Sequence, residues 1–299
     1  MKRKALGRDV GLSVRMLVAS GLLGLLYVVF AVVLFTALDV GLVPMILLVG
    51  ALALFQYYTS DKLALRAAGA KVVEREQAPE LHDMVERLCA MADLPKPRVA
   101  VIDAEMPNAF ATGRSPKHSA VAVTTGLWNR LEPREVEAVV AHELSHIANR
   151  DVLVMTLASF FAMLAGLVTR FAMYGGMGRS NRSGPPVWLI VLAVSVVTYA
   201  ISFVLIRTIS RYREYAADRG AALLTGAPEN LMSALQKITS EIAQIPSRDL
   251  RQVEAMNAFF IIPANVRAGL GELFLTHPPT EKRLAKLAEL ARELGRPAV

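Results

Sequence analysis

Long apolar stretches alternate with long polar stretches along this chain. Four stretches carry no charged residue, and they cover residues 16–38, 40–60, 152–169 and 187–206. They are 23, 21, 18 and 20 residues long, and a helix of about 20 apolar residues crosses the hydrocarbon core of a bilayer, which is about 30 Å thick. The pattern therefore predicts four hydrophobic membrane helices, in a first hairpin within residues 1–60 and a second hairpin within residues 151–206.

The polar remainder falls into two pieces, residues 61–150 and 207–299. In the first piece, the spacing of apolar residues predicts helices at Glu80–Ala92 and Arg134–Asn149, and strands at Arg98–Asp103, Ala109–Thr112 and Ala120–Thr125. In the second piece it predicts helices at Arg211–Leu224, Pro228–Ile242 and Glu281–Leu294. The expected fold class is therefore mainly α with a small β-sheet.

The composition agrees with a membrane protein that also has a polar domain. Apolar residues make up 54% of the chain and charged residues 20%, with a net charge of +7. The charge is spread over the flanks of the apolar stretches, which suits anionic lipid headgroups and argues against nucleic acid as a partner. The single cysteine, Cys89, forms no intrachain disulfide and is expected to be a packed core thiol.

Basic residues flank the first hairpin on one side. They precede its first helix and follow its second helix, at Lys2, Arg3, Lys4, Arg8, Arg15, Lys62, Arg66, Lys71 and Arg75. The turn between the two helices, around Asp39 and Gly41, has no basic residue. The positive-inside rule therefore predicts that both ends of this hairpin, and the polar domain after it, lie in the cytoplasm.

The second hairpin leaves two arrangements open. Its connecting loop, Gly175–Pro186, should lie outside the cell, yet Arg170, Arg179 and Arg182 lie in this loop or beside it. Either the hairpin spans the membrane with a basic outer loop, or it is partly embedded or packed on the polar domain.

The most specific chemical signal is the sequence His142-Glu143-Leu144-Ser145-His146. Two histidines four residues apart lie on the same face of a helix, where neutral imidazoles suit Zn²⁺ and leave positions for a carboxylate and a water. Glu143 can take the proton from that water as it attacks a carbonyl carbon. The pattern is typical of zinc metalloproteases, and it is favoured over a chance arrangement of histidine and glutamate on a helix.

Two further acidic residues, Glu214 and Asp218, are also four residues apart on a predicted helix. Alone, such a pair most often belongs to a solvated helix face. A site of this class needs a third protein ligand from a second helix, and it needs an outer carboxylate that orients a ligating histidine. Glu214 fits the first role and Asp218 the second.

These motifs resemble the HtpX-type membrane metallopeptidases, which are integral-membrane relatives of the CAAX prenyl proteases. The similar stretches follow in the same order and are His142–Asp151, Pro107–Gly113, Arg213–Asp218, and Thr276–Thr280 followed by Arg283. The four apolar stretches also fall where this family has them. The resemblance implies a zincin-type (gluzincin) catalytic domain that holds one Zn²⁺ per chain through His142, His146 and Glu214.

The resemblance also implies a substrate-binding strand. Asn108, Ala109, Phe110 and Ala111 are similar to an edge strand that lines the cleft and pairs with the backbone of an extended substrate, with Asn108 polarising the substrate. The alternative is an ordinary strand and turn closed by Gly113.

Two further roles come from the resemblance. His277 is similar to a histidine near the metal that stabilises the oxyanion of the reaction, and a loop histidine held by the prolines after it is an equal alternative. Arg283 is expected to pair with Asp218. His82 and His118 match no motif and are expected at the surface.

The sequence as a whole predicts a zinc endopeptidase, a multi-pass protein of a bacterial-type inner membrane that cleaves membrane proteins at the cytoplasmic face. Its expected partners are the lipid bilayer and membrane-protein or unfolded polypeptide substrates, and the resemblance suggests quality control under stress. An inactive membrane scaffold is the alternative, but His142, Glu143, His146 and Glu214 are all present. A transporter is disfavoured because no charged residue lies within the apolar stretches. Because His146 is so near the second hairpin, the metal is expected within roughly 10 Å of the membrane boundary.

Overall fold

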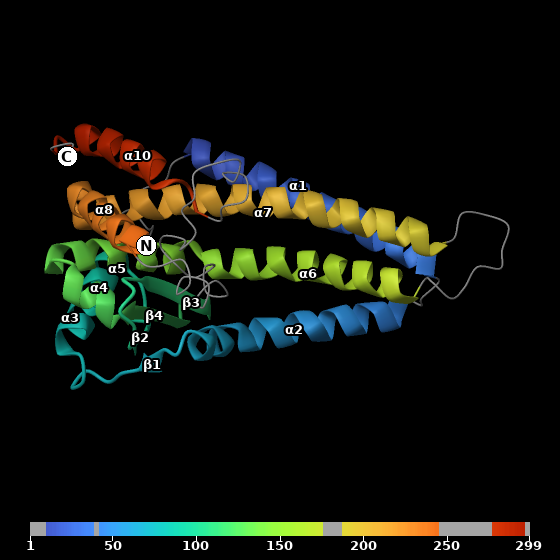
Figure 1. Ribbon diagram of the computed structural model, residues 1–299, viewed down its shortest axis with the longest axis horizontal. Coiled ribbons are helices and arrows are strands. Elements are labelled where there is room, and N and C mark those ends of the chain that lie inside the picture. Colours follow the sequence, from blue (N-terminus) through green and yellow to red (C-terminus); the bar gives the residue numbers. More distant parts are fainter. Residues whose placement is uncertain (1–9, 39–41, 176–186, 245–276, 297–299) are drawn as a thin grey trace.

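The computed structural model describes residues 10–38, 42–175, 187–244 and 277–296 of the 299-residue chain. The described part consists of a bundle of long helices and, at one end of the bundle, a compact part made of a sheet and shorter helices (Figure 1). The basic residues Lys2–Arg8, the turn at Asp39 and Gly41, residues 176–186 of the loop in the second hairpin, and Thr276 lie outside the described residues.

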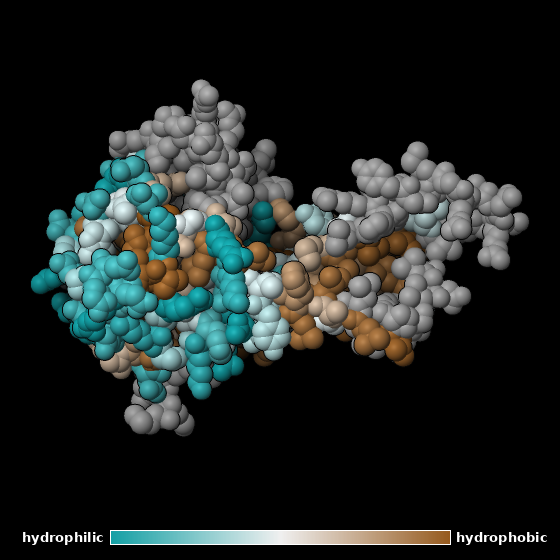
Figure 2. Space-filling view, turned by 90° about the horizontal axis from the view of Figure 1, so that it is seen from below, coloured by the Kyte–Doolittle hydropathy of each residue, from teal (hydrophilic) through white to brown (hydrophobic). Residues whose placement is uncertain are grey.

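Four long helices form the bundle, and they are α1 (Val10–Leu38), α2 (Leu42–Ala67), α6 (Asp151–Gly175) and α7 (Val187–Thr225). Phe30 and Leu34 of α1 are buried against Ala165 of α6 and Val191 of α7. Large apolar side chains also cover the outside of the bundle, whereas hydrophilic residues cover much of the compact part (Figure 2). An apolar outer surface of this size is what a lipid environment requires.

Two of the described helices are long and apolar enough to cross a membrane, as judged by length and composition. They are α1 from Val10 to Leu34 and α7 from Trp188 to Thr225. The sequence predicts four such helices, and two are found within the part of the chain that the structure describes. The second half of α2 carries polar residues from Gln56 to Asp61, and its last turns lie against the sheet.

Helix α7 is continuous across the boundary between the second hairpin and the second polar piece. The sequence predicts an apolar helix to Ile206 and a helix from Arg211 to Leu224 that leaves this apolar stretch, and residues 187–225 form one helix. No glycine or proline occurs between Ile206 and Arg211 to interrupt it. The same helix that packs in the bundle therefore carries Glu214 and Asp218.

A four-stranded sheet forms the middle of the compact part. Its strands are β1 (Lys71–Val72), β2 (Arg98–Ile102), β3 (Ala109–Ser115) and β4 (His118–Thr124). They lie in the order β1-β2-β4-β3, with β2 parallel to β4 and the other two pairs antiparallel. Strand β3 is therefore at one edge of the sheet.

Side chains alternate along the strands, so each strand contributes residues to both faces of the sheet. Both faces are covered by helices and are buried. Val99, Val121 and Val123 belong to the main core, which also contains apolar residues of α3 (Pro79–Ala92), α5 (Pro133–Asn149) and α8 (Pro228–Gln244). Ala122 and Phe110 belong to the opposite face, where they pack against the last turns of α2. Two further helices complete the compact part, α4 (Thr125–Arg130) and α10 (Thr280–Glu293).

The expected fold class, mainly α with a small sheet, is confirmed. The short strand β1 was not predicted, because two residues leave no alternating pattern to detect. Strand β3 continues past Gly113 to Ser115, so the alternative in which Gly113 closes the strand is wrong. Gly113 has a φ of 142°, and a Cβ at this position would collide with the backbone of His118 and Ser119 in β4. Glycine therefore permits the close approach and the irregular pairing between Gly113 and Ser115.

The exposure of three residues outside the catalytic motifs can be compared with the predictions from the sequence. Cys89 is buried in the main core, as predicted, and burial raises the pKa of its thiol to about 11. His118 is exposed, as predicted. The prediction that His82 lies at the surface is wrong, because its ring is buried and its Nε2 lies 3.0 Å from the carbonyl oxygen of Val73.

The first turn of α5 is capped by a side chain that also bonds α8. Pro133 occupies the first turn, and the Glu135 carboxylate accepts a hydrogen bond of 2.8 Å from the backbone N–H of Glu132. The same carboxylate accepts hydrogen bonds from Ser233 and Lys237 of α8, at 2.6 and 2.8 Å. Glu135 thus caps α5 and joins it to α8 at once.

Replacing Glu135 by alanine is expected to lower the free energy of unfolding by about 2–3 kcal/mol, because the change removes a helix cap and two hydrogen bonds to a charged group. Denaturant unfolding in detergent micelles measures this loss. Glu137→Ala is the matched control, since Glu137 on the same helix makes a partly exposed ion pair with Arg87 that is worth at most about 1 kcal/mol. Equal losses in the two variants would contradict the role given to Glu135.

The contribution of Glu135 is also expected to depend on pH. Burial raises its pKa, but hydrogen bonds from Lys237, Ser233 and the Glu132 backbone outweigh burial and hold the pKa below its ordinary value. A carboxyl group whose folded pKa is depressed stabilises the fold above its unfolded pKa, and this stabilisation is lost as the pH falls through the folded pKa. The difference in stability between wild type and Glu135→Ala should therefore shrink in acid, which unfolding curves at a series of pH values will measure.

Candidate metal centre

Helix α5 presents His142 and His146 one turn apart on the same face, as the sequence predicts. Both lie in the buried middle of the compact part, with the His142 side chain 1% exposed and the His146 side chain 13% exposed. Their Nε2 atoms are 3.1 Å apart. The two rings therefore turn the same nitrogen toward one common point.

Helix α7 brings Glu214 to that point. Its Oε2 lies 3.6 Å from Nε2 of His142, and its Oε1 lies 3.4 Å from Nε2 of His146. One potential ligand atom from each of the three residues lies within 4.8 Å of the other two. The three residues that the sequence assigns to the metal are thus brought together from two helices that are far apart in the chain.

The geometry and chemistry of the cluster fit a zinc ion. Two nitrogens bound to one tetrahedral zinc at about 2.0–2.1 Å would lie about 3.3–3.4 Å apart, which is close to the observed separation of the histidine nitrogens. The Glu214 carboxylate is buried beside these nitrogens, with its Oε2 also 3.6 Å from the guanidinium of Arg283. Two histidine nitrogens and a buried carboxylate are ligand types that zinc prefers.

A buried aspartate contacts Nδ1 of each histidine, the ring nitrogen that does not face the common point. Oδ1 of Asp218 lies 3.0 Å from Nδ1 of His142, and Oδ2 of Asp151 lies 2.7 Å from Nδ1 of His146. Contacts at Nδ1 leave Nε2 of each ring to face the common point. The sequence predicts this contact for Asp218. It does not predict the contact of Asp151, which appears only as the last residue of the stretch His142–Asp151 that resembles the family.

Each of these aspartates is in turn paired with a buried arginine. Arg283 of α10 binds both oxygens of Asp218, with nitrogen–oxygen distances of 2.9 and 2.6 Å. Arg213 of α7 places its Nε 2.9 Å from Oδ1 of Asp151. The expected contact between Arg283 and Asp218 is therefore present, and a second pair of the same kind holds the other histidine.

The negative side chains around His142 set its electrostatic environment. Burial lowers the pKa of His142, but Asp218 and Glu214 outweigh burial and raise the pKa to about 9. The centre therefore attracts positive charge strongly, whether it is carried by a proton or by a metal ion.

Glu143 lies between the metal-ligand cluster and the edge strand β3. Its side chain is buried, and its Oε2 accepts a hydrogen bond of 2.8 Å from the backbone N–H of Ala111. Burial raises the pKa of Glu143, and the two neighbouring histidines only partly offset this effect. A carboxylate with a raised pKa holds a proton more readily than an exposed glutamate, as a general base requires.

The predicted substrate-binding strand lies beside this glutamate. The backbone of Asn108 is bonded to Thr124 of β4, whereas the N–H of Ala111 points away from β4 toward Glu143. Because backbone groups alternate along a strand, Ala109 and Ala111 face the free edge and Phe110 faces β4. The side chain of Phe110 is buried against α2, on the face of the sheet opposite to the main core.

His277 also reaches the centre. It is buried, and its Nδ1 lies 3.1 Å from Oε2 of Glu214. Of the two interpretations left open by the sequence, the structure agrees with a histidine close to the metal ligands.

Comparisons with known proteins agree with this site. Peptidase family M48 matches residues 75–291. The chain is 50% identical to Protease HtpX homolog 2 of Methanosarcina acetivorans, over 99% of this chain and 100% of the relative. It is 53% identical to Protease HtpX homolog 1 of Streptomyces coelicolor, over 96% of this chain and 95% of the relative.

A solved structure shares the fold. The crystal structure of S. mikatae Ste24p matches with a TM-score of 0.55 and 20% sequence identity, and the match covers 93% of this chain and 67% of that chain. The arrangement of the bundle and the compact part is therefore one that an experimental structure also contains.

Asp151→Asn and Asp218→Asn are each expected to weaken zinc affinity by roughly 10–100-fold, because each change removes the charge that holds a histidine ring in place. Competition with a chromogenic chelator measures the affinity. Asp103→Asn, at an exposed position outside the centre, is the control and should leave the affinity unchanged. Wild-type affinity in both variants at the centre would show that these contacts do not position the ligands.

Proposed function

The chain belongs to peptidase family M48 and is a membrane metallopeptidase, and we propose that it is a zinc-dependent endopeptidase that cleaves membrane proteins at the cytoplasmic face of a bacterial-type inner membrane. The observation that carries this proposal is the convergence of His142, His146 and Glu214 beside the buried carboxylate of Glu143. One zinc ion held by these three ligands would polarise the substrate carbonyl and lower the pKa of the attacking water.

Glu143 is the general base of this proposal. Its Oε2 is held by the N–H of Ala111, so the carboxylate is fixed between the edge strand and the histidines. It accepts a proton from the attacking water as the water oxygen bonds to the carbonyl carbon. It then passes that proton to the amide nitrogen as the C–N bond breaks.

We assign substrate positioning to the edge strand and His277. An extended peptide would pair with the outward-facing backbone of Ala109 and with the carbonyl of Ala111, whose N–H is bonded to Glu143, and the family resemblance gives Asn108 the polarising contact to the substrate. His277 would donate a hydrogen bond to the oxyanion as it develops. Its place beside Glu214 supports this role.

The proposed division of the chain follows the same arrangement. Residues 1–60 and 151–206 form two membrane hairpins, and residues 61–150 and 207–299 form one cytoplasmic catalytic domain. Helix α6 begins at Asp151, and α7 continues from the bundle to Glu214. Both helices therefore tie the catalytic centre to the bundle, which supports cleavage close to the lipid surface. The expected substrates are damaged or misassembled membrane proteins during stress.

Separate effects on zinc and on catalysis are expected from two groups of variants. Replacing His142, His146 or Glu214 by alanine should lower the zinc content below one ion per chain and abolish activity. Glu143→Gln should keep its zinc and lower the rate of casein hydrolysis by about 10²–10⁴-fold, because only the base is removed. Elemental analysis and the protease assay measure the two properties on the same preparation. Loss of zinc from Glu143→Gln, or full activity in it, would contradict the assigned roles.

Cleavage sites should lie in the cytoplasmic loops or termini of a membrane substrate. A model multispanning protein, reconstituted with the enzyme in one orientation and digested, allows the cut sites to be mapped by mass spectrometry. Glu143→Gln is the control for cuts made by contaminating proteases. Cuts confined to periplasmic loops or to the middle of membrane helices would contradict the proposed topology.

A further inference from the structure

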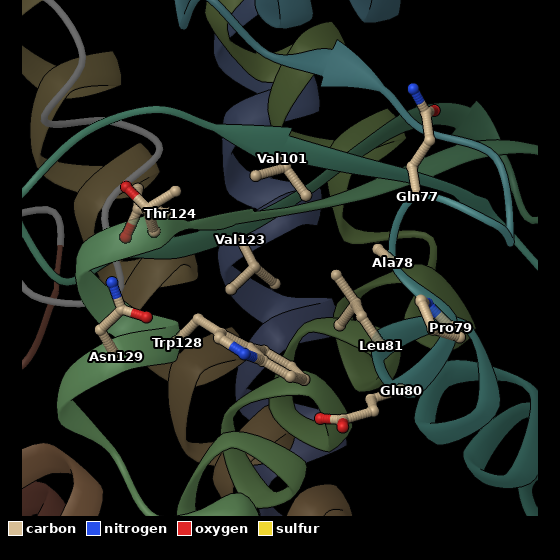
Figure 3. Close-up of a pocket in the computed structure, with 11 residues that line it drawn as sticks. Gln77, Ala78, Pro79, Glu80, Leu81, Val101, Val123, Thr124, Trp128 and Asn129 are labelled. Carbon is tan, nitrogen blue, oxygen red and sulfur yellow. The ribbon is translucent and has the colours of Figure 1, made fainter.

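A cavity lies in the compact part, and none of its lining residues belongs to the metal-ligand cluster. It has a volume of about 390 Å³ and opens between the start of α3, the ends of β2 and β4, and α4. Leu81, Val101 and Val123 form its apolar walls, and Trp128, Glu80 and Asn129 lie around it (Figure 3). None of these residues takes part in the proposed peptide-bond chemistry.

The chemistry of the cavity suits a side chain that is apolar along its length and cationic at its end. The aliphatic part of such a side chain would cover Leu81 and Val123, and its cation would lie against the indole of Trp128 and the carboxylate of Glu80. Glu80 has no cationic partner among the described residues within salt-bridge distance. Asn129 is exposed next to Trp128, on the side away from Glu80 (Figure 3), and can bond a peptide backbone.

The charge around the cavity supports the same occupant. Five acids and one base occur between Glu74 and Glu86, in a chain whose net charge is +7. The one base, Arg75, is already paired with Asp83 and Glu86. This edge of a basic protein is therefore locally acidic and attracts basic segments.

The position of the cavity indicates where such a segment would come from. Helices α3 and α4 lie at the end of the molecule opposite to the helix bundle (Figure 1), so the cavity opens to water. Cytoplasmic loops of membrane proteins are rich in lysine and arginine. In the topology of the proposed function, these are the substrate segments that the catalytic domain meets.

We propose that this cavity is an exosite that binds a lysine or arginine side chain from a cytoplasmic segment of the substrate, at a distance from the scissile bond. This inference rests on the proposed function and adds a substrate preference to it: polypeptides with basic cytoplasmic segments are bound more tightly than neutral or acidic ones.

Trp128 provides a direct readout of binding. The chain has two tryptophans, Trp128 and Trp188, so the full-length double variant Glu143→Gln, Trp188→Phe reports on the cavity and does not cleave the probe. The probe is a synthetic peptide of alternating leucine and arginine, and the comparison peptides carry glutamate or serine in place of arginine. A saturable change in Trp128 fluorescence is expected with the arginine peptide.

Two variants in this background test the assigned contacts. Glu80→Gln should weaken binding of the arginine peptide by about threefold or more, because it removes the carboxylate opposite the indole. Glu76→Gln is the matched control, since it makes the same change of charge in the same acidic stretch at an exposed residue outside the cavity. Ala78→Phe fills the cavity and should abolish binding, with retained zinc content as the check that the protein has folded.

Kinetics separate the exosite from the catalytic centre. For a substrate with an arginine-rich cytoplasmic loop, Glu80→Gln should raise KM about threefold and leave kcat unchanged. The KM of a substrate without basic residues in that loop should not change.

The possible results distinguish this inference from the function on which it rests. No response of Trp128, an equal response to the serine peptide, or wild-type affinity in Glu80→Gln would overturn the exosite, even if the enzyme cleaves its substrates normally. Binding that depends on Glu80, in a protein that cleaves no substrate and holds no zinc, would support the basic-peptide site and overturn the proposed protease function.

Discussion

A cluster of buried charges determines how the helices of the compact part come together. Four carboxylates and two guanidinium groups are less than 10% exposed there, and they belong to Glu143, Asp151, Glu214, Asp218, Arg213 and Arg283. Burying an unpaired charge costs several kcal/mol, so each aspartate is stable only with its arginine in contact. Four carboxylates and two guanidinium groups leave an excess of negative charge, although Arg283 also lies 3.6 Å from Oε2 of Glu214. A divalent cation between the two histidines would balance this excess at the point where α5, α6, α7 and α10 meet.

Helices α6 and α7 are part of this arrangement because they supply the groups on one side of it. Arg150 has a left-handed φ of 58°, which ends α5 and turns the chain directly into α6. The first residue of α6, Asp151, thereby folds back onto His146. Helix α7 then carries Arg213 to Asp151 and presents Glu214 to both histidines. Movement of α6 against α7 would therefore act on the candidate metal ligands themselves.

The sequence predicts the parts of this structure that depend on regular spacing. Helical periodicity places His142 and His146 on one face, and the same spacing pairs Glu214 with Asp218, so the candidate metal ligands are identified before the fold is known. The contact between Asp151 and His146 is not predicted, because five residues is no helical spacing and the contact needs the turn at Arg150. The burial of His82 depends on packing between α3 and the strand region, which spacing does not describe. Of the four predicted membrane helices, α1 and α7 are long and apolar enough among the described residues, and the sequence alone does not show that α2 also ends against the sheet.

The edge strand β3 illustrates how binding and self-protection are combined in one element. An exposed strand edge offers unpaired backbone groups that can pair with another chain, which favours aggregation as well as substrate binding. Here the N–H of Ala111 is already bonded to Glu143, and the irregular pairing after Gly113 shortens the regular edge. In the proposed function, a peptide that pairs with β3 must therefore fit a short length of strand beside the Glu143 carboxylate. The hydrogen bond that limits unwanted pairing also fixes Glu143 at the place where a bound peptide bond would be attacked.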